Sequence, residues 1–270
     1  MKSPADLAAA LETDGYLADR GLAAALFIAL SLNRPVLLEG EVGTGKTEVA
    51  KALATVLRRR LIRLQCYEGI DAGQALYEWD YARQLLNIRA ERTTDLYGPE
   101  FLTERPLLSA IRAGDQAVLL IDEIDRADDE FEAFLLEILS DFQVTIPEIG
   151  TIAASRPPLV VLTSNRTREL HDALKRRCLY HWIGYPSAER EAEIVAIRVP
   201  EAGDVLLGKV VAAVQRLREL DLAKPPGVAE TIDWTRTLAF LGAEELVPET
   251  LGTVVKDHED LELVRAWLAN

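Results

Sequence analysis

The segment GEVGTGKT at residues 40–47 constrains the fold of this chain more than any other stretch. It satisfies the pattern G-x-x-x-x-G-K-[ST], in which glycines let backbone N–H groups turn inward around the phosphates of a nucleotide. An apolar run at 35–40 precedes it and a helix-like segment follows it. A glycine-rich turn that happens to carry a lysine is the alternative, and this strand–loop–helix context disfavours it. The sequence therefore predicts a nucleotide-phosphate site.

The residues of this segment have separate predicted roles. Lys46 is expected to reach the β- and γ-phosphate oxygens, and the Thr47 hydroxyl is expected to ligate Mg²⁺. The positive end of the following helix adds to the field that attracts the phosphates. We expect nucleotide contacts along the whole run, which comprises Gly40, Glu41, Val42, Gly43, Thr44, Gly45, Lys46, Thr47 and Glu48.

Apolar runs alternate with segments of helical periodicity before residue 186. Strands are expected at 35–40, 60–66, 117–122, 158–164 and 179–185, and helices are expected between them. This alternation predicts a mainly parallel sheet that helices cover on both faces. From Pro186 onwards the segments are all helix-like. We therefore predict an α/β/α core over residues 1–186 and a small all-helical subdomain over 187–270.

The composition disfavours several classes of protein. The net charge is −14, which repels a phosphate backbone and argues against nucleic acid as the main partner. The dense basic run at 58–63 is interpreted as a solvated helix end. The most apolar stretch, 21–32, is shorter than the roughly 20 residues of a membrane span and predicts a buried helix, with no stable membrane insertion. The N-terminus lacks a signal-peptide layout, which indicates a cytoplasmic protein.

Metal and disulfide frameworks are also disfavoured. The chain has two cysteines, Cys66 and Cys178, and they lie far apart without a histidine or cysteine at ligand spacing. The three histidines, His171, His181 and His258, form no metal-binding pattern. A disulfide-bonded or zinc-bound framework is therefore not expected.

Two acids follow the apolar run at 117–122. Asp122 would lie at the carboxyl end of a central strand, beside the phosphate loop, where it can hold Mg²⁺ and its waters. Glu123 is placed to orient and polarise a water against the γ-phosphate. A buried strand that leaves the sheet through an acidic turn is the alternative for the pair alone. Together with the loop at 40–47, the pair favours hydrolysis.

Further polar residues follow the next strand. Asn165 is placed either to position the attacking water or to act as an ordinary turn residue. Lys175, Arg176 and Arg177 lie at the end of an expected helix. They either complement its macrodipole or supply an arginine finger to a neighbouring subunit. Their spacing alone does not separate these two roles.

These motifs, in this order and with a helical segment after them, resemble an AAA+ ATPase over nearly the whole chain. The resemblance implies ATP as the nucleotide, Asn165 as sensor 1, and Arg177 or Arg176 as the finger that acts in trans. It also implies a ring of subunits, commonly a hexamer. Arg236 lies where such proteins often place sensor 2, although an exposed arginine on an amphipathic helix has the same pattern.

Two segments resemble the MoxR group of AAA+ proteins. Residues 69–98 are similar to its helix-2 insert, and residues 142–158 are similar to the hairpin before sensor 1. The strings YEGIDAGQALYEWDYARQLL and LYGPEFLTERPLLSAI most resemble the CoxD branch. That branch is associated with maturation of the molybdenum–copper carbon monoxide dehydrogenase and with a von Willebrand A domain partner. The group often has an asparagine where this chain has Asp125, which adds an acid near the site.

The insert is rich in aromatic and apolar residues, and two interpretations remain open for them. Residues at helical spacing are more often core than contact surface, although tyrosine and tryptophan among charges also suit a partner-facing element. We favour the partner-facing role. The residues concerned are Tyr77, Trp79, Tyr81, Leu85 and Leu86.

The sequence thus predicts an ATPase that remodels a client protein. The resemblance to the CoxD branch implies that this client is a metalloenzyme awaiting its cofactor. A DNA-acting AAA+ motor is one alternative, and the acidic charge weighs against it. A scaffold that binds ATP without hydrolysis is another, and Glu123 with Asn165 weighs against it. A small-molecule kinase or a GTPase is the third, and the guanine-recognition pattern N-K-x-D of a GTPase is missing after the strand at 158–164.

Overall fold

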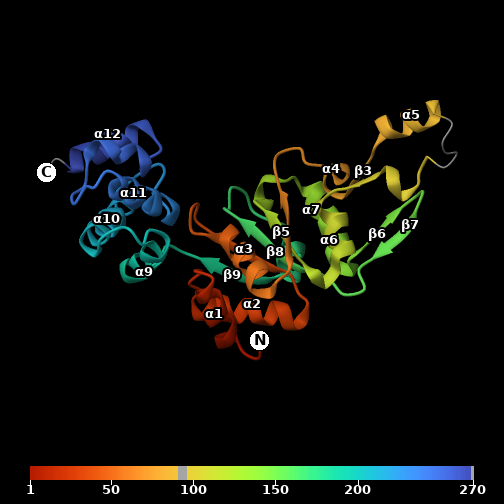
Figure 1. The fold of residues 1–270 in the computed structure, drawn as a ribbon, viewed down its shortest axis with the longest axis horizontal. Coiled ribbons are helices and arrows are strands. Elements are labelled where there is room, and N and C mark those ends of the chain that lie inside the picture. Colours follow the sequence, from red (N-terminus) through yellow and green to blue (C-terminus); the bar gives the residue numbers. More distant parts are fainter. Residues whose placement is uncertain (91–95, 269–270) are drawn as a thin grey trace. The chain divides into compact units, whose positions relative to one another are not determined.

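The computed structural model describes residues 1–90 and 96–268, and these form two compact units. The sheet unit comprises residues 1–14, 18–39 and 47–182. The helical unit comprises residues 15–17, 40–46 and 183–270. Figure 1 shows the elements of both units along the chain.

The main sheet of the sheet unit has five strands in the order β2-β5-β8-β1-β9. Pairing is parallel between β2 and β5, between β5 and β8, and between β1 and β8. Each of the five predicted runs forms one of these strands, so the predicted parallel sheet is confirmed. The strands are β1 (Val36–Gly40), β2 (Arg60–Gln65), β5 (Ala117–Asp122), β8 (Leu159–Ser164) and β9 (Leu179–Ile183).

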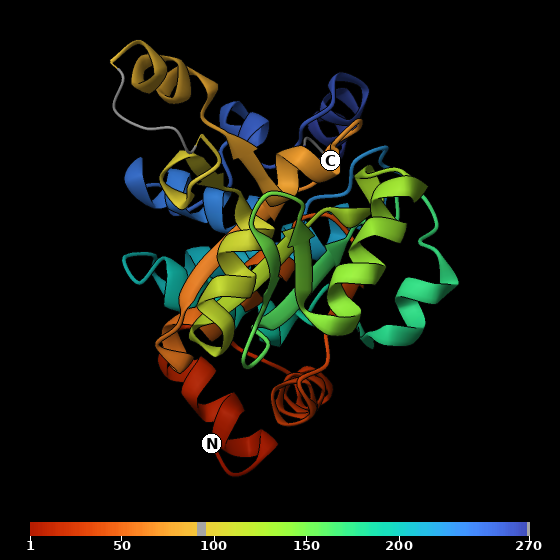
Figure 2. The ribbon, with the colours of Figure 1, turned by 90° about the vertical axis from the view of Figure 1, so that its right-hand side faces the viewer.

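Strands β1, β5 and β8 are buried along their whole length because helices cover the sheet. Figure 2 shows α6 (Pro106–Ala113) and α7 (Asp129–Asp141), in yellow-green, over one face. Asp128 caps α7 by accepting a hydrogen bond from the Phe131 N–H at 2.8 Å. The apolar face of α7 then packs into the same core as β2, β5 and β8. The remaining helices of this unit include α1 (Pro4–Thr13), α2 (Arg20–Leu32), α3 (Lys46–Leu57) and α8 (Asp172–Arg177).

Two expectations for single segments hold only in part. The apolar stretch at 21–32 forms α2, but one side of that helix faces solvent, since Ile28 is 40% and Leu32 is 60% exposed. The basic run at 58–63 is not a helix end alone, because residues 60–63 are part of β2. In the part of the chain that the structure describes, no helix is long and apolar enough to cross a membrane.

Between β2 and β5 the chain forms a small antiparallel sheet of β3 (Tyr77–Trp79) and β4 (Leu102–Glu104). Trp79 is buried, as a core residue is expected to be, whereas Tyr81, Leu85 and Leu86 are exposed. The partner-facing role of the exposed residues stays a prediction. Residues 91–95 of the predicted insert lie outside the described residues. The other elements here are α4 (Ala72–Leu76), α5 (Tyr81–Arg89) and the 3-10 helices η1 (Pro99–Phe101) and η2 (Gly114–Gln116).

The predicted hairpin region contains β6 (Gln143–Ile146) and β7 (Gly150–Ala153), which pair antiparallel. The 3-10 helix η3 (Ile124–Arg126) follows β5 directly.

The helical unit packs around the fully buried Trp234. The helical unit also contains a buried ion pair. The guanidinium of Arg218 donates two hydrogen bonds of 2.7 Å to the carboxylate of Glu191, whose side chain is fully buried. The elements of this unit are α9 (Ala188–Arg198), α10 (Asp204–Leu217), α11 (Val228–Phe240), η4 (Pro248–Thr253) and α12 (His258–Leu268).

Candidate functional site

Residues 40–46 of the phosphate loop belong to the helical unit and have the backbone conformation that the glycines permit. Gly43 and Gly45 have φ angles of 77° and 88°, in the left-handed region that other residues rarely adopt. A Cβ atom added at Gly45 would meet no atom within 4 Å, so the loop is open there. The ammonium of Lys46 donates to the carbonyls of Gly40 at 2.9 Å and Glu41 at 2.6 Å. A turn of this kind with a lysine beside it suits an anionic phosphate group.

The amino end of α11 contacts this loop within the helical unit. The Val228 N–H donates to the Gly43 carbonyl at 3.0 Å. Gly227 is packed so tightly that a Cβ atom there would lie 2.7 Å from the Gly43 Cα. The Glu230 carboxylate accepts from the Gly227 N–H at 2.9 Å and closes the helix end.

Arg236 lies further along α11. It lies eight positions after Val228, which is about 12 Å at the rise of an α-helix. Its guanidinium lies 3.5 Å from the Asp233 carboxylate and donates to the Arg198 carbonyl at 3.3 Å. These contacts are those of an exposed arginine on a helix, and the sensor 2 role of Arg236 stays a prediction.

In the sheet unit, Asp122 lies at the end of β5 and its side chain is 3% exposed. One carboxylate oxygen, Oδ1, accepts from the Thr47 hydroxyl at 3.1 Å and from the Thr163 hydroxyl at 2.5 Å. Thr47 is the second residue of α3, which begins directly after the loop. A hydroxyl and a carboxylate are hard oxygen donors, so Thr47 and Asp122 fit Mg²⁺.

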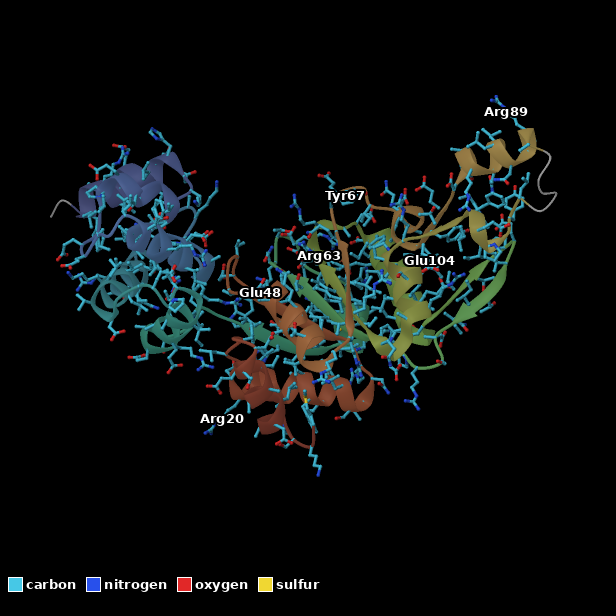
Figure 3. The ribbon with its side chains drawn as sticks, viewed as in Figure 1. Arg20, Glu48, Arg63, Tyr67, Arg89 and Glu104 are labelled. Atoms are coloured by element: carbon cyan, nitrogen blue, oxygen red, sulfur yellow. The ribbon has the colours of Figure 1, made fainter. Side chains whose placement is uncertain are left out.

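The other oxygen of Asp122 faces Arg63 on β2. The Arg63 guanidinium donates to Oδ2 from Nη2 at 2.6 Å and from Nε at 3.0 Å. Figure 3 labels Arg63 on this strand. The strand expected at 60–66 contains Arg63, but the basic run was interpreted as a solvated helix end and this residue was given no role. The available signal was the strand itself, which runs beside β5 and its terminal acid.

Glu123 follows Asp122 with a φ angle of 56°, which is uncommon for a residue other than glycine. Its N–H donates to the Thr163 hydroxyl at 2.9 Å, which fixes this turn to β8. Its carboxylate is one-third exposed and accepts from Gln65 at 3.0 Å and from Arg126 at 3.3 Å. An oriented, solvent-accessible carboxylate at this point suits the predicted role in holding a water.

Asn165 follows β8, and a buried acid holds its backbone. The Asp125 carboxylate accepts from the Asn165 N–H at 3.2 Å and from the N–H and hydroxyl of Thr167, both at 2.8 Å. Asp125 is 2% exposed. The sequence indicated only an extra acid near the site at this position. The structure shows that Asp125 ties the turn after β5 to the turn after β8.

Arg176 and Arg177 are exposed at the end of α8. Arg177 donates to the Leu136 carbonyl at 3.4 Å. Exposure is compatible with a contact to another subunit, and the finger role of either residue stays a prediction.

Cys66 follows β2 and lies beside the acids. Burial raises the pKa of its thiol to about 12, and the negative charges of Asp122, Asp125 and Glu123 add to this effect. Cys66 is therefore a neutral thiol at physiological pH. The candidate ligands and proton acceptors of this site are oxygen atoms.

Comparisons with known proteins are consistent with this geometry. Residues 35–178 match the family described as AAA domain (dynein-related subfamily). The protein NorQ of Paracoccus denitrificans is 27% identical over 195 residues, which cover 69% of this chain and 66% of NorQ. The protein CbbQ of Hydrogenophilus thermoluteolus is 28% identical over 228 residues, which cover 80% of this chain and 76% of CbbQ.

Two further similarities extend over most of the chain. An uncharacterized protein of Staphylococcus saprophyticus is 21% identical over 248 residues, covering 87% of this chain and 89% of that protein. Among solved structures, a variant of RuvB from Thermotoga maritima matches with a TM-score of 0.54 and 21% identity. The match covers 89% of this chain and 70% of that chain, and it supports the fold alone.

Proposed function

Because the chain belongs to the AAA domain family, in its dynein-related subfamily, we propose that it is a MoxR-type AAA+ ATPase that remodels a client protein. The similarity to NorQ and CbbQ supports the MoxR type. The observation that carries the proposal is the hydrogen bond between Thr47 and Asp122. It brings the hydroxyl of the phosphate-loop motif against the acid at the end of β5, which is the pairing that a nucleotide with Mg²⁺ requires.

Each residue of the site has a proposed role in hydrolysis. Lys46 holds the β- and γ-phosphate oxygens of ATP, and Thr47 with Asp122 holds Mg²⁺. Mg²⁺, when bound, offsets the negative charge of the phosphate oxygens. Glu123 orients the attacking water and accepts its proton. Asn165, whose backbone Asp125 holds, positions the same water.

A ring assembly completes the proposed site. Arg177, or Arg176 beside it, reaches the nucleotide of the neighbouring subunit as the finger, and Arg236 acts as sensor 2. Hydrolysis in the core over residues 1–186 moves the lid over residues 187–270. A hexamer is the proposed assembly, and the exposure of both arginines on α8 supports the contact in trans.

The client of the proposed ATPase is a molybdenum–copper carbon monoxide dehydrogenase-like metalloenzyme, with a von Willebrand A domain protein as partner. The resemblance of the strings YEGIDAGQALYEWDYARQLL and LYGPEFLTERPLLSAI to the CoxD branch supports this assignment. The exposed Tyr81 and Leu86 on α5 support the role of the insert as a contact surface.

The test is ATP turnover of the wild type against Glu123→Gln, with the mass in solution recorded with and without ATP and Mg²⁺. Loss of the proton acceptor is expected to lower turnover about 100-fold or more while ATP still binds. Glu12→Gln makes the same change at an exposed position on α1 and should leave turnover unchanged. Tight ATP binding without turnover in the wild type, even after addition of the von Willebrand A protein, would instead identify a scaffold.

A further inference from the structure

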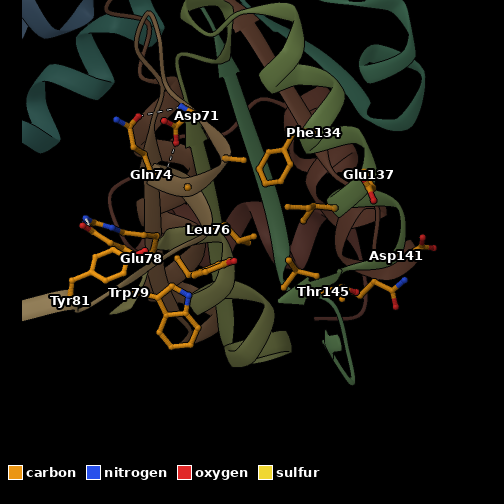
Figure 4. A pocket seen from close by; sticks show the side chains of 17 residues that line it. Asp71, Gln74, Leu76, Glu78, Trp79, Tyr81, Phe134, Glu137, Asp141 and Thr145 are labelled. Atoms are coloured by element: carbon orange, nitrogen blue, oxygen red, sulfur yellow. Dashed lines mark hydrogen bonds and ion pairs between the residues drawn. The ribbon is translucent and has the colours of Figure 1, made fainter. Parts of the chain in front are cut away.

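A groove of about 880 Å³ lies in the sheet unit, away from the residues assigned to ATP. Its walls come from α4 and β3 on one side and from α7 and β6 on the other, as Figure 4 shows. The apolar part of the lining includes Tyr77, Trp79, Phe134 and Ile138. A hollow of this size with aromatic walls is large enough to accept several side chains of a ligand.

The groove runs along the edges of two strands. Residues 77–79 of β3 and residues 143–145 of β6 all line it. Successive side chains of a strand point to opposite faces, so a ligand against one face would meet only alternate residues. Three consecutive lining residues indicate that the edge of each strand, with its backbone groups, borders the groove.

The outer edge of β3 carries backbone groups that its pairing with β4 does not use. The Arg105 N–H donates to the Leu76 carbonyl at 3.1 Å, which makes these two residues a hydrogen-bonded pair. Because such pairs alternate in an antiparallel ladder, the N–H and C=O groups of Tyr77 and Trp79 point away from β4. Within residues 1–90 and 96–268, no other strand pairs with this edge.

The outer edge of β6 has the same property. The Ala154 N–H donates to the Phe142 carbonyl at 2.9 Å, so the backbone groups of Gln143 and Thr145 point away from β7. In the described part of the chain, β6 pairs with β7 alone. Each free edge is three residues long, about 10 Å at the rise of a strand. Edges of this kind bind an extended peptide through backbone hydrogen bonds.

The charges that line the groove are mainly negative. Asp71 and Glu78 belong to the insert side, and Glu137 and Asp141 lie one helical turn apart on α7, as Figure 4 labels them. Of the described residues that line the groove, Arg105 alone carries a positive charge, and it forms an ion pair with Glu78. An occupant with positive charges therefore complements this surface.

We propose that this groove binds an extended, basic segment of a partner polypeptide, in which lysine or arginine alternates with apolar residues. The apolar side chains would pack against Trp79 and Phe134, the backbone would pair with a free strand edge, and the basic side chains would face the carboxylates. The proposal deepens the proposed function, on which it rests for the role of the occupant as a client. Peptide binding itself requires no ATP turnover.

The experiment measures fluorescence anisotropy of a short labelled peptide of alternating Lys and Val against the full-length protein in nucleotide-free buffer. Saturable binding is expected, and a peptide of alternating Glu and Val should not bind. The same basic peptide with alternate backbone nitrogens methylated should bind more weakly, because methylation removes the donors that pair with a strand edge. Equal binding of all three peptides would overturn the proposal.

Two variants locate the binding. Glu137→Gln/Asp141→Asn should lower the affinity for the basic peptide by about 2- to 30-fold, because each exposed charge pair contributes little binding energy. Glu219→Gln/Asp221→Asn removes two exposed acids of the helical unit and should leave the affinity unchanged. Equal affinities of the two variants would overturn the proposal.

A second copy of the chain is the competing occupant. Self-association that Glu137→Gln/Asp141→Asn abolishes, without peptide binding to the wild type, would assign the groove to that contact and overturn the proposal. ATP turnover of the same preparations separates the two proposals. Intact peptide binding without turnover would count against the ATPase alone, whereas turnover without peptide binding would count against the groove alone.

Discussion

The two oxygens of the Asp122 carboxylate face different neighbours. Oδ1 accepts from the hydroxyls of Thr47 and Thr163, whereas Oδ2 accepts mainly from the guanidinium of Arg63 and lies 3.4 Å from the Thr47 hydroxyl. Arg63 is half exposed and also donates to Gln65, whereas Asp122 is buried. Solvent around the guanidinium weakens this ion pair. A cation bound at Asp122 would compete with Arg63 for Oδ2.

Arg63→Met is expected to lower the Mg²⁺ concentration needed for half-maximal binding of a fluorescent ATP analogue. The physical reason is that removal of the competing positive charge leaves Oδ2 available to the metal. The change should be about 1.4- to 5-fold, the range of a partly exposed ion pair. Arg60→Met removes an exposed arginine of the same strand and is the control. A higher Mg²⁺ requirement in Arg63→Met would show that Arg63 positions Asp122 instead.

At the scale of elements, the join between α11 and the phosphate loop depends on two glycines. Gly43 has a positive φ angle, and Gly227 approaches it so closely that no side chain fits between them. This close approach lets the Val228 N–H reach the Gly43 carbonyl. The loop conformation and the start of α11 are therefore coupled within the helical unit.

Gly227→Ala is expected to destabilise the helical unit by about 1–3 kcal/mol, the usual cost of overpacking, and to weaken ATP binding. The added methyl group would lie 2.7 Å from the Gly43 Cα, so either the loop or α11 must shift. Thermal unfolding and nucleotide titration measure the two effects.

Gly208→Ala on α10 is the matched control. Nothing lies within 4 Å of a Cβ atom there, and alanine in a helix interior is expected to stabilise by about 0.5–1 kcal/mol. Equal melting temperatures of Gly227→Ala and the wild type would show that the contact with Gly43 is not maintained in solution.

At the scale of the whole molecule, two buried thiols link stability to alkaline pH. Burial raises the pKa of both Cys66 and Cys178 to about 12, from the ordinary thiol value of 9.0. The unfolded chain therefore loses these protons near pH 9, whereas the folded chain retains them to about pH 12. Their contribution to stability is fully present below pH 9 and is lost as the pH rises from 9 towards 12.

The free energy of unfolding should fall above pH 9 by up to about 1.4 kcal/mol per pH unit for each thiol. Urea unfolding at several pH values between 8 and about 11 measures this slope. The variant Cys66→Ala/Cys178→Ala is less stable at pH 8, because it leaves small cavities, but its slope above pH 9 should be shallower. Equal slopes in the two proteins would show that the buried thiols ionise as readily as exposed ones.

Local patterns were sufficient to predict the strands and to select most of the candidate site residues. A few consecutive residues contain each of these patterns, so each can be recognised in the sequence. The patterns are the five apolar runs, the phosphate-loop motif and the acid pair at 122–123. The sequence did not predict the contacts of Arg63, Thr163 and Asp125. Each of them bonds to a residue about 40 or more positions away, and no local pattern specifies such a partner.

The sequence by itself determined the class of fold and the chemistry of the loop, because periodicity and glycine content act over neighbouring residues. The tertiary structure alone decided which hydroxyls face Asp122 and which backbone Asp125 holds. It also decided which insert residues are buried and that two free strand edges border one groove. These features depend on the register of strands that are distant in the chain, and register is set by packing of the whole sheet unit.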